Sequence, residues 1–170
     1  MLEKKLGLLV AGLAVAVLAL GLAGCGQGAD SGEIRIGGNY EVTGGIASYA
    51  KSSTNGVKLA IKEANANGGV LGKQLKFVVA DNKSEPSEAA NAVTKLITQD
   101  KVVAIIGAIA SSNTLAGSPI AHENKIPFIS PISTNPKVTF EDGKVKEYAF
   151  RACFIDPFQG TVMANFATKS

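Results

Sequence analysis

The chain has 170 residues, of which 46% are hydrophobic and 18% are charged, and its formal net charge is +3. This length allows one ordinary globular domain, and the composition excludes a disordered chain. A charge so close to balance also argues against a nucleic-acid-binding protein. The mean hydropathy of +0.19 is high for a soluble protein, and a segment near the start of the chain carries much of the excess.

That segment has the pattern of an export signal. Every residue from 6 to 24 is Leu, Val, Ala or Gly, and Lys4 and Lys5 precede the run. A basic stretch followed by an apolar one is typical of a signal peptide, although about 20 apolar residues can also form a transmembrane helix. We favour a signal peptide over residues 1–24, because the run is rich in Gly and ends at Cys25.

The apolar run ends in Leu22-Ala23-Gly24-Cys25, in which small residues precede a cysteine. This motif resembles the lipobox of bacterial lipoproteins. The resemblance implies that the peptide is cut before Cys25 and that the Cys25 thiol is lipidated. The protein would then be extracytoplasmic and lipid-anchored to the bacterial cell membrane, on its periplasmic face or outer surface. Residues 25–33, rich in Gly and small polar side chains, are expected to form a flexible tether.

Cysteine usage predicts neither a disulfide nor a metal site. With Cys25 lipidated, Cys153 has no partner in the chain, so no internal disulfide is expected. The two cysteines also lack His or Cys neighbours at the spacing of metal ligands. Cys153 lies in the apolar run 149–155, where we expect a buried small hydrophobic residue. The sequence predicts no cofactor.

Beyond the tether, short apolar runs alternate with helical patterns. Val57, Ala60, Ile61 and Ala64 recur at the spacing of one helix face, and the glycines at 68–69 end that pattern. The run 102–107 is continuously apolar, as expected of a strand buried on both faces of a parallel sheet. The predicted strands are 34–38, 75–80, 102–107 and 127–129, and the predicted helices are 52–67, 84–100, 113–124 and 158–168.

This alternation predicts an α/β fold with a parallel sheet, right-handed crossovers and helices on both faces. Ligands of such sheets bind at the carboxyl ends of the strands, which selects three loops: 40–50, 107–114 and 130–136. The second loop runs into a helix N-terminus, whose free N–H groups favour an anion such as a carboxylate. The third contains two prolines that stiffen a turn rich in donors and acceptors. Any single Ser or Thr in these loops could instead be a helix cap.

Six segments follow one another along the chain: 34–37, 43–49, 67–72, 107–114, 129–136 and 150–160. In this order they resemble the amino-terminal lobe of the leucine/isoleucine/valine-type periplasmic binding proteins of ABC importers. The resemblance implies a type I binding-protein fold with a Rossmann- or flavodoxin-like sheet. Its two lobes would close on an amino acid and deliver it to a membrane permease. Residues 34–155 would form the amino-terminal lobe, and residues 156–170 would begin the second.

The resemblance also implies roles for individual residues. Ser111 would hold the α-carboxylate of the ligand through its hydroxyl and backbone N–H. Thr134 would add a backbone N–H to the carboxylate and a hydroxyl to the ammonium, and the Ile132 carbonyl would accept from the ammonium. Tyr49 would line the side-chain pocket, while Ser133 is a weaker candidate whose side chain could cap the turn. A buried zwitterion needs such directed hydrogen bonds, and hydroxyls suit both of its ends.

The length of the chain leads to a further expectation. Members of the family are roughly twice as long, so the acidic residue and aromatics of their second lobe would be missing here. We therefore expect a fragment or truncated gene product that binds amino acids weakly or not at all. The predicted helix 158–168 would belong to the second lobe and would expose Val162, Met163 and Phe166.

Catalytic function is not indicated. The segment 67–73 lacks the glycine that a phosphate-binding loop needs six positions before Lys73, and it precedes a strand. His122 is the single histidine and no nucleophile elbow accompanies it, so a surface or capping role is expected. Two functions remain: the substrate-binding lipoprotein of an amino-acid importer, with leucine, isoleucine or valine as ligand, or an extracellular ligand-sensing domain of a receptor. The lipobox favours the first.

Overall fold

The computed structural model describes residues 32–169 of the 170. The predicted signal peptide, Cys25 and residues 25–31 of the predicted tether lie outside the described residues. In chain order the elements are β1 (Glu33–Tyr40), α2 (Ala47–Ala66), β2 (Gln74–Asp81), α3 (Pro86–Thr98), β3 (Ala104–Gly107), α4 (Ser111–Glu123), β4 (Phe128–Ser130), η1 (Pro136–Val138), β5 (Phe140–Glu141), β6 (Lys144–Val145), β7 (Ala149–Arg151) and α5 (Asp156–Lys169). Over this range, none of the helices combines the length and apolar character that crossing a membrane requires.

A parallel sheet organises the described residues. Its order is β2-β1-β3-β4-β7, and β1 lies between β2 and β3, so that Gly38 pairs with Val79 on one side and Ile106 on the other. At the far edge β7 pairs with β4 through Ile129 and Phe150. The short strands β5 and β6 form a separate antiparallel hairpin. The predicted α/β class with a parallel sheet is confirmed.

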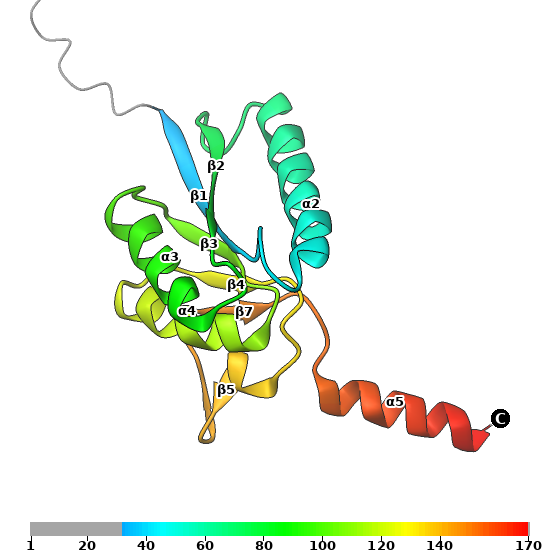
Figure 1. Cartoon of the computed structure of the whole chain (residues 1–170). Coiled ribbons are helices and arrows are strands. Elements are labelled where there is room, and N and C mark those ends of the chain that lie inside the picture. The colour runs from blue at the N-terminus through cyan, green and yellow to red at the C-terminus, as the bar shows by residue number, and fades with distance from the viewer. Residues whose placement is uncertain (1–31, 170) are drawn as a thin grey trace, which may run out of the picture. The chain divides into compact units, whose positions relative to one another are not determined.

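Helices cover both faces of the sheet, as the sequence predicts. Helix α2 lies on one face, while α3 and α4 lie together on the other (Figure 1). The close approach of α3 and α4 depends on Gly117, because a Cβ there would lie 2.8 Å from Cγ2 of Val93. The connection from β1 to β2 therefore runs over one face, and the connection from β2 to β3 runs over the other.

The main hydrophobic core fills the face that α3 and α4 cover. Leu96 and Val93 of α3 are fully buried against Ile105 of β3 and Phe128 of β4. The predicted helix 84–100 is thus confirmed as α3. Burial of large aliphatic and aromatic side chains is the dominant favourable term in folding, so this layer anchors the lobe.

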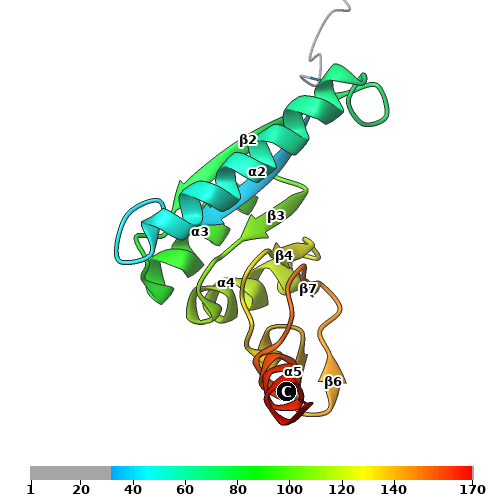
Figure 2. The same cartoon turned by 90° about the vertical axis from the view of Figure 1, so that its right-hand side faces the viewer.

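The opposite face is covered less completely. Figure 2 views it from the α2 side, where α2 crosses β1 and β2 while no helix lies over β4 and β7. Ile129 is accordingly 38% exposed and Phe150 is 47% exposed. The run 102–107 was predicted to be buried on both faces, which is wrong in part, because Val103 precedes β3 and is 53% exposed.

The remaining differences concern element ends and short elements. Helix α2 begins at Ala47, five residues before the predicted start, and Glu33 belongs to β1 and not to the tether. The sequence did not predict β5, β6, β7 or η1, which have two or three residues each and are too short to show a periodicity. Helix α5 agrees with the predicted helix 158–168, and its apolar residues Val162, Met163 and Phe166 are 48%, 64% and 76% exposed.

The core assignment predicts a contrast between two helical leucines. Leu96→Ala removes a fully buried side chain and should lower the free energy of unfolding by about 3 kcal/mol. Leu59→Ala removes a side chain of α2 that is 57% exposed and should cost less than about 1 kcal/mol. Urea unfolding of both variants measures the difference, and equal losses would contradict the assignment.

Candidate functional site

Three loops meet at the carboxyl edge of the sheet, where sequence reasoning placed the site. They follow β1, β3 and β4, which are neighbours in the sheet. The connections that leave β1 and β3 pass over opposite faces, so the crevice between these two strands is a topological switch point. Ligands of open α/β sheets bind in such crevices.

A buried carboxylate holds the loop after β3. Glu41 follows β1 directly and is fully buried. Its carboxylate accepts hydrogen bonds from the backbone N–H groups of Ile109, at 3.0 and 3.2 Å, and Ala110, at 3.0 Å, and from the side-chain amide of Asn113 at 2.9 Å. Each donor is an N–H group, and such charge-assisted bonds are stronger than neutral ones. An internal anion therefore already occupies part of the loop that the sequence assigned to a bound carboxylate.

Buried asparagines extend this network beneath the loops. Asn113 donates to Asn82 at 3.3 Å, and Asn82 donates to Asn39 at 3.1 Å. Asn39 in turn donates to the carbonyl of Ala89 in α3 at 3.4 Å. These bonds join the ends of β1 and β2 to the first turn of α4, so the network fixes the loops on the hydrophobic core.

Hydroxyl groups tie the loop after β4 to the loop after β3. The Ser133 hydroxyl lies 2.7 Å from that of Thr114 and donates to the carbonyls of Ile109, at 3.1 Å, and Ala108, at 3.2 Å. Ser130 donates to Ala108 at 2.8 Å and accepts from the Ser133 N–H at 3.0 Å. Ser133 is only 1% exposed, so its side chain positions the loops and does not face solvent.

Ser111 and the loop after β4 come together at the surface. The Ser111 hydroxyl accepts a hydrogen bond from the N–H of Asn135 at 3.3 Å, which leaves its own O–H free to donate. The N-cap of α4 is Ala110, which provides no side-chain cap, so the first-turn N–H groups stay available for an anion. Within residues 32–169, the hydroxyl of Thr134 and the carbonyl of Ile132 make no hydrogen bond. Ile132 as a whole residue is 37% exposed.

Arg151, at the end of β7, holds the loop after β4 in place through hydrogen bonds to its backbone. Its guanidinium donates to the carbonyls of Ser133, at 3.1 Å, and Asn135 and Pro136, both at 3.0 Å, and to the Thr139 hydroxyl at 2.8 Å. The planar fork of an arginine suits several acceptors at once. Arg151 was not predicted from the sequence, although a lone cation within an apolar segment is a usable signal.

Cys153 contacts the same loop. Its thiol donates to the carbonyl of Ser133 at 3.3 Å, and the side chain is half-buried, less than the predicted burial. Burial raises the pKa of the Cys153 thiol, and the nearby Arg151 guanidinium opposes that rise. The thiol is therefore a weak hydrogen-bond donor to the loop. Within the described residues, no group of three His, Cys, Asp or Glu side chains could hold a metal ion.

Asp81 at the end of β2 organises the loop after β1. Its carboxylate accepts from the Thr43 N–H at 3.1 Å, the Thr43 hydroxyl at 2.7 Å and the Lys83 N–H at 2.9 Å. Tyr49 lies beyond this loop, in the first turn of α2, and is 62% exposed. Within the described residues, Tyr49 makes no hydrogen bond to the loops after β3 and β4. Five residues were predicted to contact the ligand. Four of them, Ser111, Ile132, Ser133 and Thr134, lie at the start of α4 and in the neighbouring loop after β4, and Tyr49 lies apart from them.

A family model described as "Periplasmic binding protein" matches residues 33–170. The chain belongs to this family, and the resemblance read from its motifs is confirmed. Its relatives are solute-binding proteins of transporters and not enzymes, in line with the expectation from the sequence.

Characterised relatives are amino-acid-binding proteins. An amino acid binding protein of Pseudomonas aeruginosa is 38% identical over 124 residues, which cover 73% of this chain and 32% of the relative. The leucine-, isoleucine-, valine-, threonine- and alanine-binding protein of the same organism is 32% identical over 166 residues, which cover 98% of this chain and 42% of the relative. The chain therefore spans less than half the length of the relatives it matches.

Solved structures share the fold. The branched-chain amino acid transporter substrate binding protein LivJ of Streptococcus pneumoniae, in complex with isoleucine, superposes with a TM-score of 0.75 at 40% identity, over 81% of this chain and 38% of that one. The leucine binding protein LivK of Thermotoga maritima gives a TM-score of 0.70 at 43% identity, over 80% of this chain and 37% of that one.

The Glu41 network predicts a large loss of stability when the carboxylate is altered. Glu41→Gln turns an N–H donor toward the backbone N–H of Ile109 or Ala110, so the free energy of unfolding should fall by about 2–3 kcal/mol. Glu63→Gln, on the exposed side of α2, is the matched control and should change stability by less than about 0.5 kcal/mol. Denaturant unfolding compares the two, and similar stabilities for both variants would contradict the role of Glu41.

Asp81 predicts a pH dependence of the loop after β1. Burial disfavours its charged form, but the hydrogen bonds from Thr43 and Lys83 outweigh burial and lower the pKa of Asp81 below its ordinary value of 3.8. The stabilisation is therefore present above the ordinary pKa of an aspartate and is lost as pH falls through the folded value. In an NMR titration, the Thr43 and Lys83 amide signals should shift with a midpoint below 3.8, and Asp81→Asn should abolish that shift. A midpoint at or above the ordinary value would contradict this prediction.

Proposed function

We propose that this lobe captures an amino acid for an ABC importer, with leucine, isoleucine or valine as the ligand. The observation that carries the proposal is the hydrogen bond from the Asn135 N–H to the Ser111 hydroxyl. This bond brings the start of α4 and the loop after β4 to one place at the carboxyl edge of the sheet. The names of the relatives, which bind leucine and other amino acids, support the choice of ligand.

In this proposal the ligand carboxylate binds where α4 begins. It accepts from the Ser111 hydroxyl and N–H and from the Thr134 N–H. The ammonium group donates to the carbonyl of Ile132 and the hydroxyl of Thr134. Tyr49 contributes to the pocket for the apolar side chain. Ser133, whose hydroxyl is committed to Thr114 and two carbonyls, positions the loop and does not touch the ligand.

Glu41 explains why the ligand carboxylate binds at the helix start and not deeper in the loop. The N–H groups of Ile109 and Ala110 are already saturated by Glu41, so the free donors begin at Ser111. A second carboxylate placed against Ile109 would meet a like charge, which is unfavourable. The internal anion thereby sets the depth at which the ligand sits.

We also propose that the lobe alone binds weakly, because its site is open. Ile132 and Tyr49 are 37% and 62% exposed, so a ligand here keeps one side in water. The hydrophobic contribution of the ligand side chain scales with the area removed from water. A second lobe that closes over the site would supply the missing contacts. Attachment to the membrane through Cys25, export by residues 1–24 and delivery to a permease belong to the same proposal.

The binding proposal predicts weak but specific recognition. In an NMR titration of the full chain, L-leucine should shift the amide signals of Ser111, Ile132 and Thr134, with a dissociation constant weaker than micromolar. Leucinamide, which lacks the carboxylate, should leave these signals unchanged. Ser111→Ala should weaken binding by about tenfold, while Ser112→Ala, one position along the same helix, is the control.

Two outcomes would contradict this account. If L-leucine, isoleucine and valine all leave the Ser111 and Thr134 signals unchanged, the proposed ligand site is wrong. If the chain alone binds leucine with micromolar or tighter affinity in isothermal titration, the proposed need for a second lobe is wrong.

A further inference from the structure

The end of the sheet where β1, β2 and β3 begin lies opposite the proposed ligand site and takes no part in it. There Glu33 pairs with Gln74 of β2, and the Val103 N–H donates to the carbonyl of Arg35 at 2.9 Å. The starts of β1 and β2 lie side by side near the end of α2 (Figure 1). We call this end the amino edge, and it consists of the segments 32–35, 69–76 and 99–103.

A two-residue turn projects a leucine from the amino edge. Val70 and Lys73 exchange two backbone hydrogen bonds of 2.9 Å across the turn, whose central residues are Leu71 and Gly72. Both central residues have a positive φ, of 52° and 75°, as a type I′ turn requires. Leu71 is 93% exposed and Val70 is 44% exposed. Two apolar side chains are therefore presented on a turn that hydrogen bonds hold in place.

The β5–β6 hairpin shows which residues such a turn favours. Its central residues are Asp142 and Gly143, with φ of 50° and 76°, and Asp-Gly is a favoured pair at these positions. A leucine in the left-handed region brings its Cβ close to a backbone oxygen and has no polar atom to compensate. The turn therefore does not explain the choice of Leu71, and neither does burial.

Positive charge is in excess at the amino edge. Its two carboxylates are paired, Glu33 with Lys76 at 3.4 Å and Asp100 with Lys95 at 2.6 Å. Beyond these pairs the edge holds three cations and no further carboxylate, the cations being Arg35, Lys73 and Lys101. The neighbouring segments 62–63 and 123–125 each hold one lysine and one glutamate, so they add no net charge.

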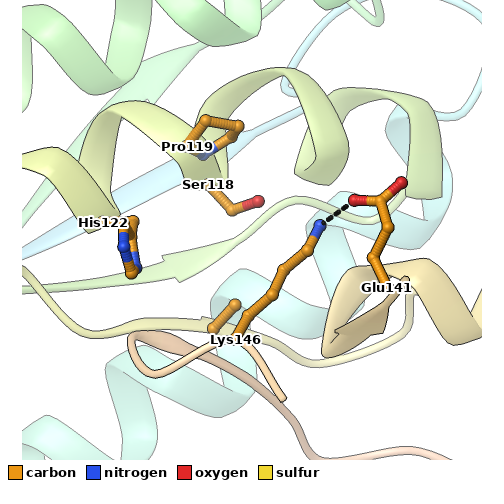
Figure 3. Close-up of a pocket in the computed structure, with 6 residues that line it drawn as sticks. Ser118, Pro119, His122, Glu141 and Lys146 are labelled. Carbon is orange, nitrogen blue, oxygen red and sulfur yellow. Dashed lines mark ion pairs between the residues drawn. The ribbon is translucent and has the colours of Figure 1, made fainter. Parts of the chain in front are cut away.

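The β5–β6 hairpin lacks this excess. Segment 137–147, which contains it, has three lysines and three carboxylates, and Figure 3 shows Lys146 beside Glu141, with 2.9 Å between the ammonium and the carboxylate. The hairpin also exposes an apolar side chain, Val145, which is 77% exposed. Single exposed apolar residues are common on protein surfaces. The amino edge differs because it combines them with unbalanced positive charge.

The proposed lipid anchor joins the chain next to the amino edge. Cys25 precedes Glu33 by eight positions, so even a fully extended connection reaches at most about 28 Å. The carboxyl edge lies at the other end of β1, which has 8 residues. Lipidation of Cys25 would thus hold the amino edge, and not the ligand site, close to the membrane.

We propose that the amino edge docks on the surface of an anionic lipid bilayer, an inference that rests on the proposed lipidation of Cys25. Leu71 and Val70 enter the headgroup region, while Lys101 and the neighbouring cations face the negative charges of the lipids. Each contact is weak alone, but attachment to the same membrane raises the effective concentration of the edge at the bilayer. The ligand site stays at the end of the sheet that is remote from the lipid.

The test measures which edge of the lobe meets the lipid. The chain is purified from bacterial membranes and placed in nanodiscs of phosphatidylglycerol and phosphatidylcholine that carry a nitroxide on the lipid headgroup. Paramagnetic broadening of the amide signals should be strong at Gly72 and Lys101, and weak at Thr43 and Thr134 of the carboxyl edge. The broadening should fall in phosphatidylcholine alone and at high salt, because the attraction is electrostatic.

Substitutions separate docking from folding. Leu71→Asn removes the apolar side chain but suits the turn, so the broadening at Gly72 should fall by about twofold or more, while the melting temperature stays the same or rises. Val145→Asn, on the β5–β6 hairpin, is the matched control and should leave the broadening unchanged. Lys101→Gln should lower the broadening only in nanodiscs that contain phosphatidylglycerol, and Lys137→Gln is its control.

Three results would overturn the proposal. They are equal broadening at the two edges, stronger broadening at the carboxyl edge, and unchanged broadening in both Leu71→Asn and Lys101→Gln. Flotation of Cys25→Ser with vesicles is read separately, because flotation equal to that of the unaltered chain contradicts the proposed anchor. The ratio of broadening between the two edges tests the docking in either case.

Discussion

A buried carboxylate organises the edge of the sheet on which the proposed function depends. Glu41 is placed by β1 in the interior, where an unpaired charge would be strongly unfavourable, and the N–H groups of Ile109 and Ala110 and the amide of Asn113 compensate it. The same bonds satisfy backbone donors that would otherwise be left without partners next to the helix start. The position of α4 relative to β1 follows from this interaction. The availability of Ser111 for a ligand follows in turn, because Glu41 uses the donors before it and leaves the donors after it.

Much of the fold could be predicted from the sequence, because its signals are periodic and local. The apolar face of α3, with Val93 and Leu96, marks both the helix and its burial, and the alternation of strands and helices predicts a parallel sheet. The strands β5, β6 and β7 could not be found in this way, since β7, for example, is defined by pairing with β4 and not by any pattern of its own. The exposure of Ile129 and Phe150 also depends on which helices cover which strands, a property of the assembled layers.

In the candidate site too, the local features could be predicted from the sequence and the long-range contacts could not. A loop between a strand and a helix start suggests an anion site, and the family resemblance assigns Ser111 and Thr134 to it. The sequence could not show that Glu41 already supplies one anion, because the contact joins residues 68 and 69 positions apart. It could not show that Ser133 is committed to a buried cluster for the same reason. Arg151, which supports that loop, is the lone charged residue of the otherwise apolar run 149–155, and its partners lie 12 to 18 positions away in the sequence.

The central claim is that Glu41 holds the loop after β3 in its binding geometry. Amide hydrogen exchange at Ile109 and Ala110, measured by NMR in the unaltered chain and in Glu41→Gln, tests it directly. The account predicts slow exchange of both amides in the unaltered chain. In Glu41→Gln they should exchange much faster, by a larger factor than the amide of Ile105, which bonds to the carbonyl of Pro127. Rapid exchange of Ile109 and Ala110 in the unaltered chain, or the same change at all three amides, would contradict it.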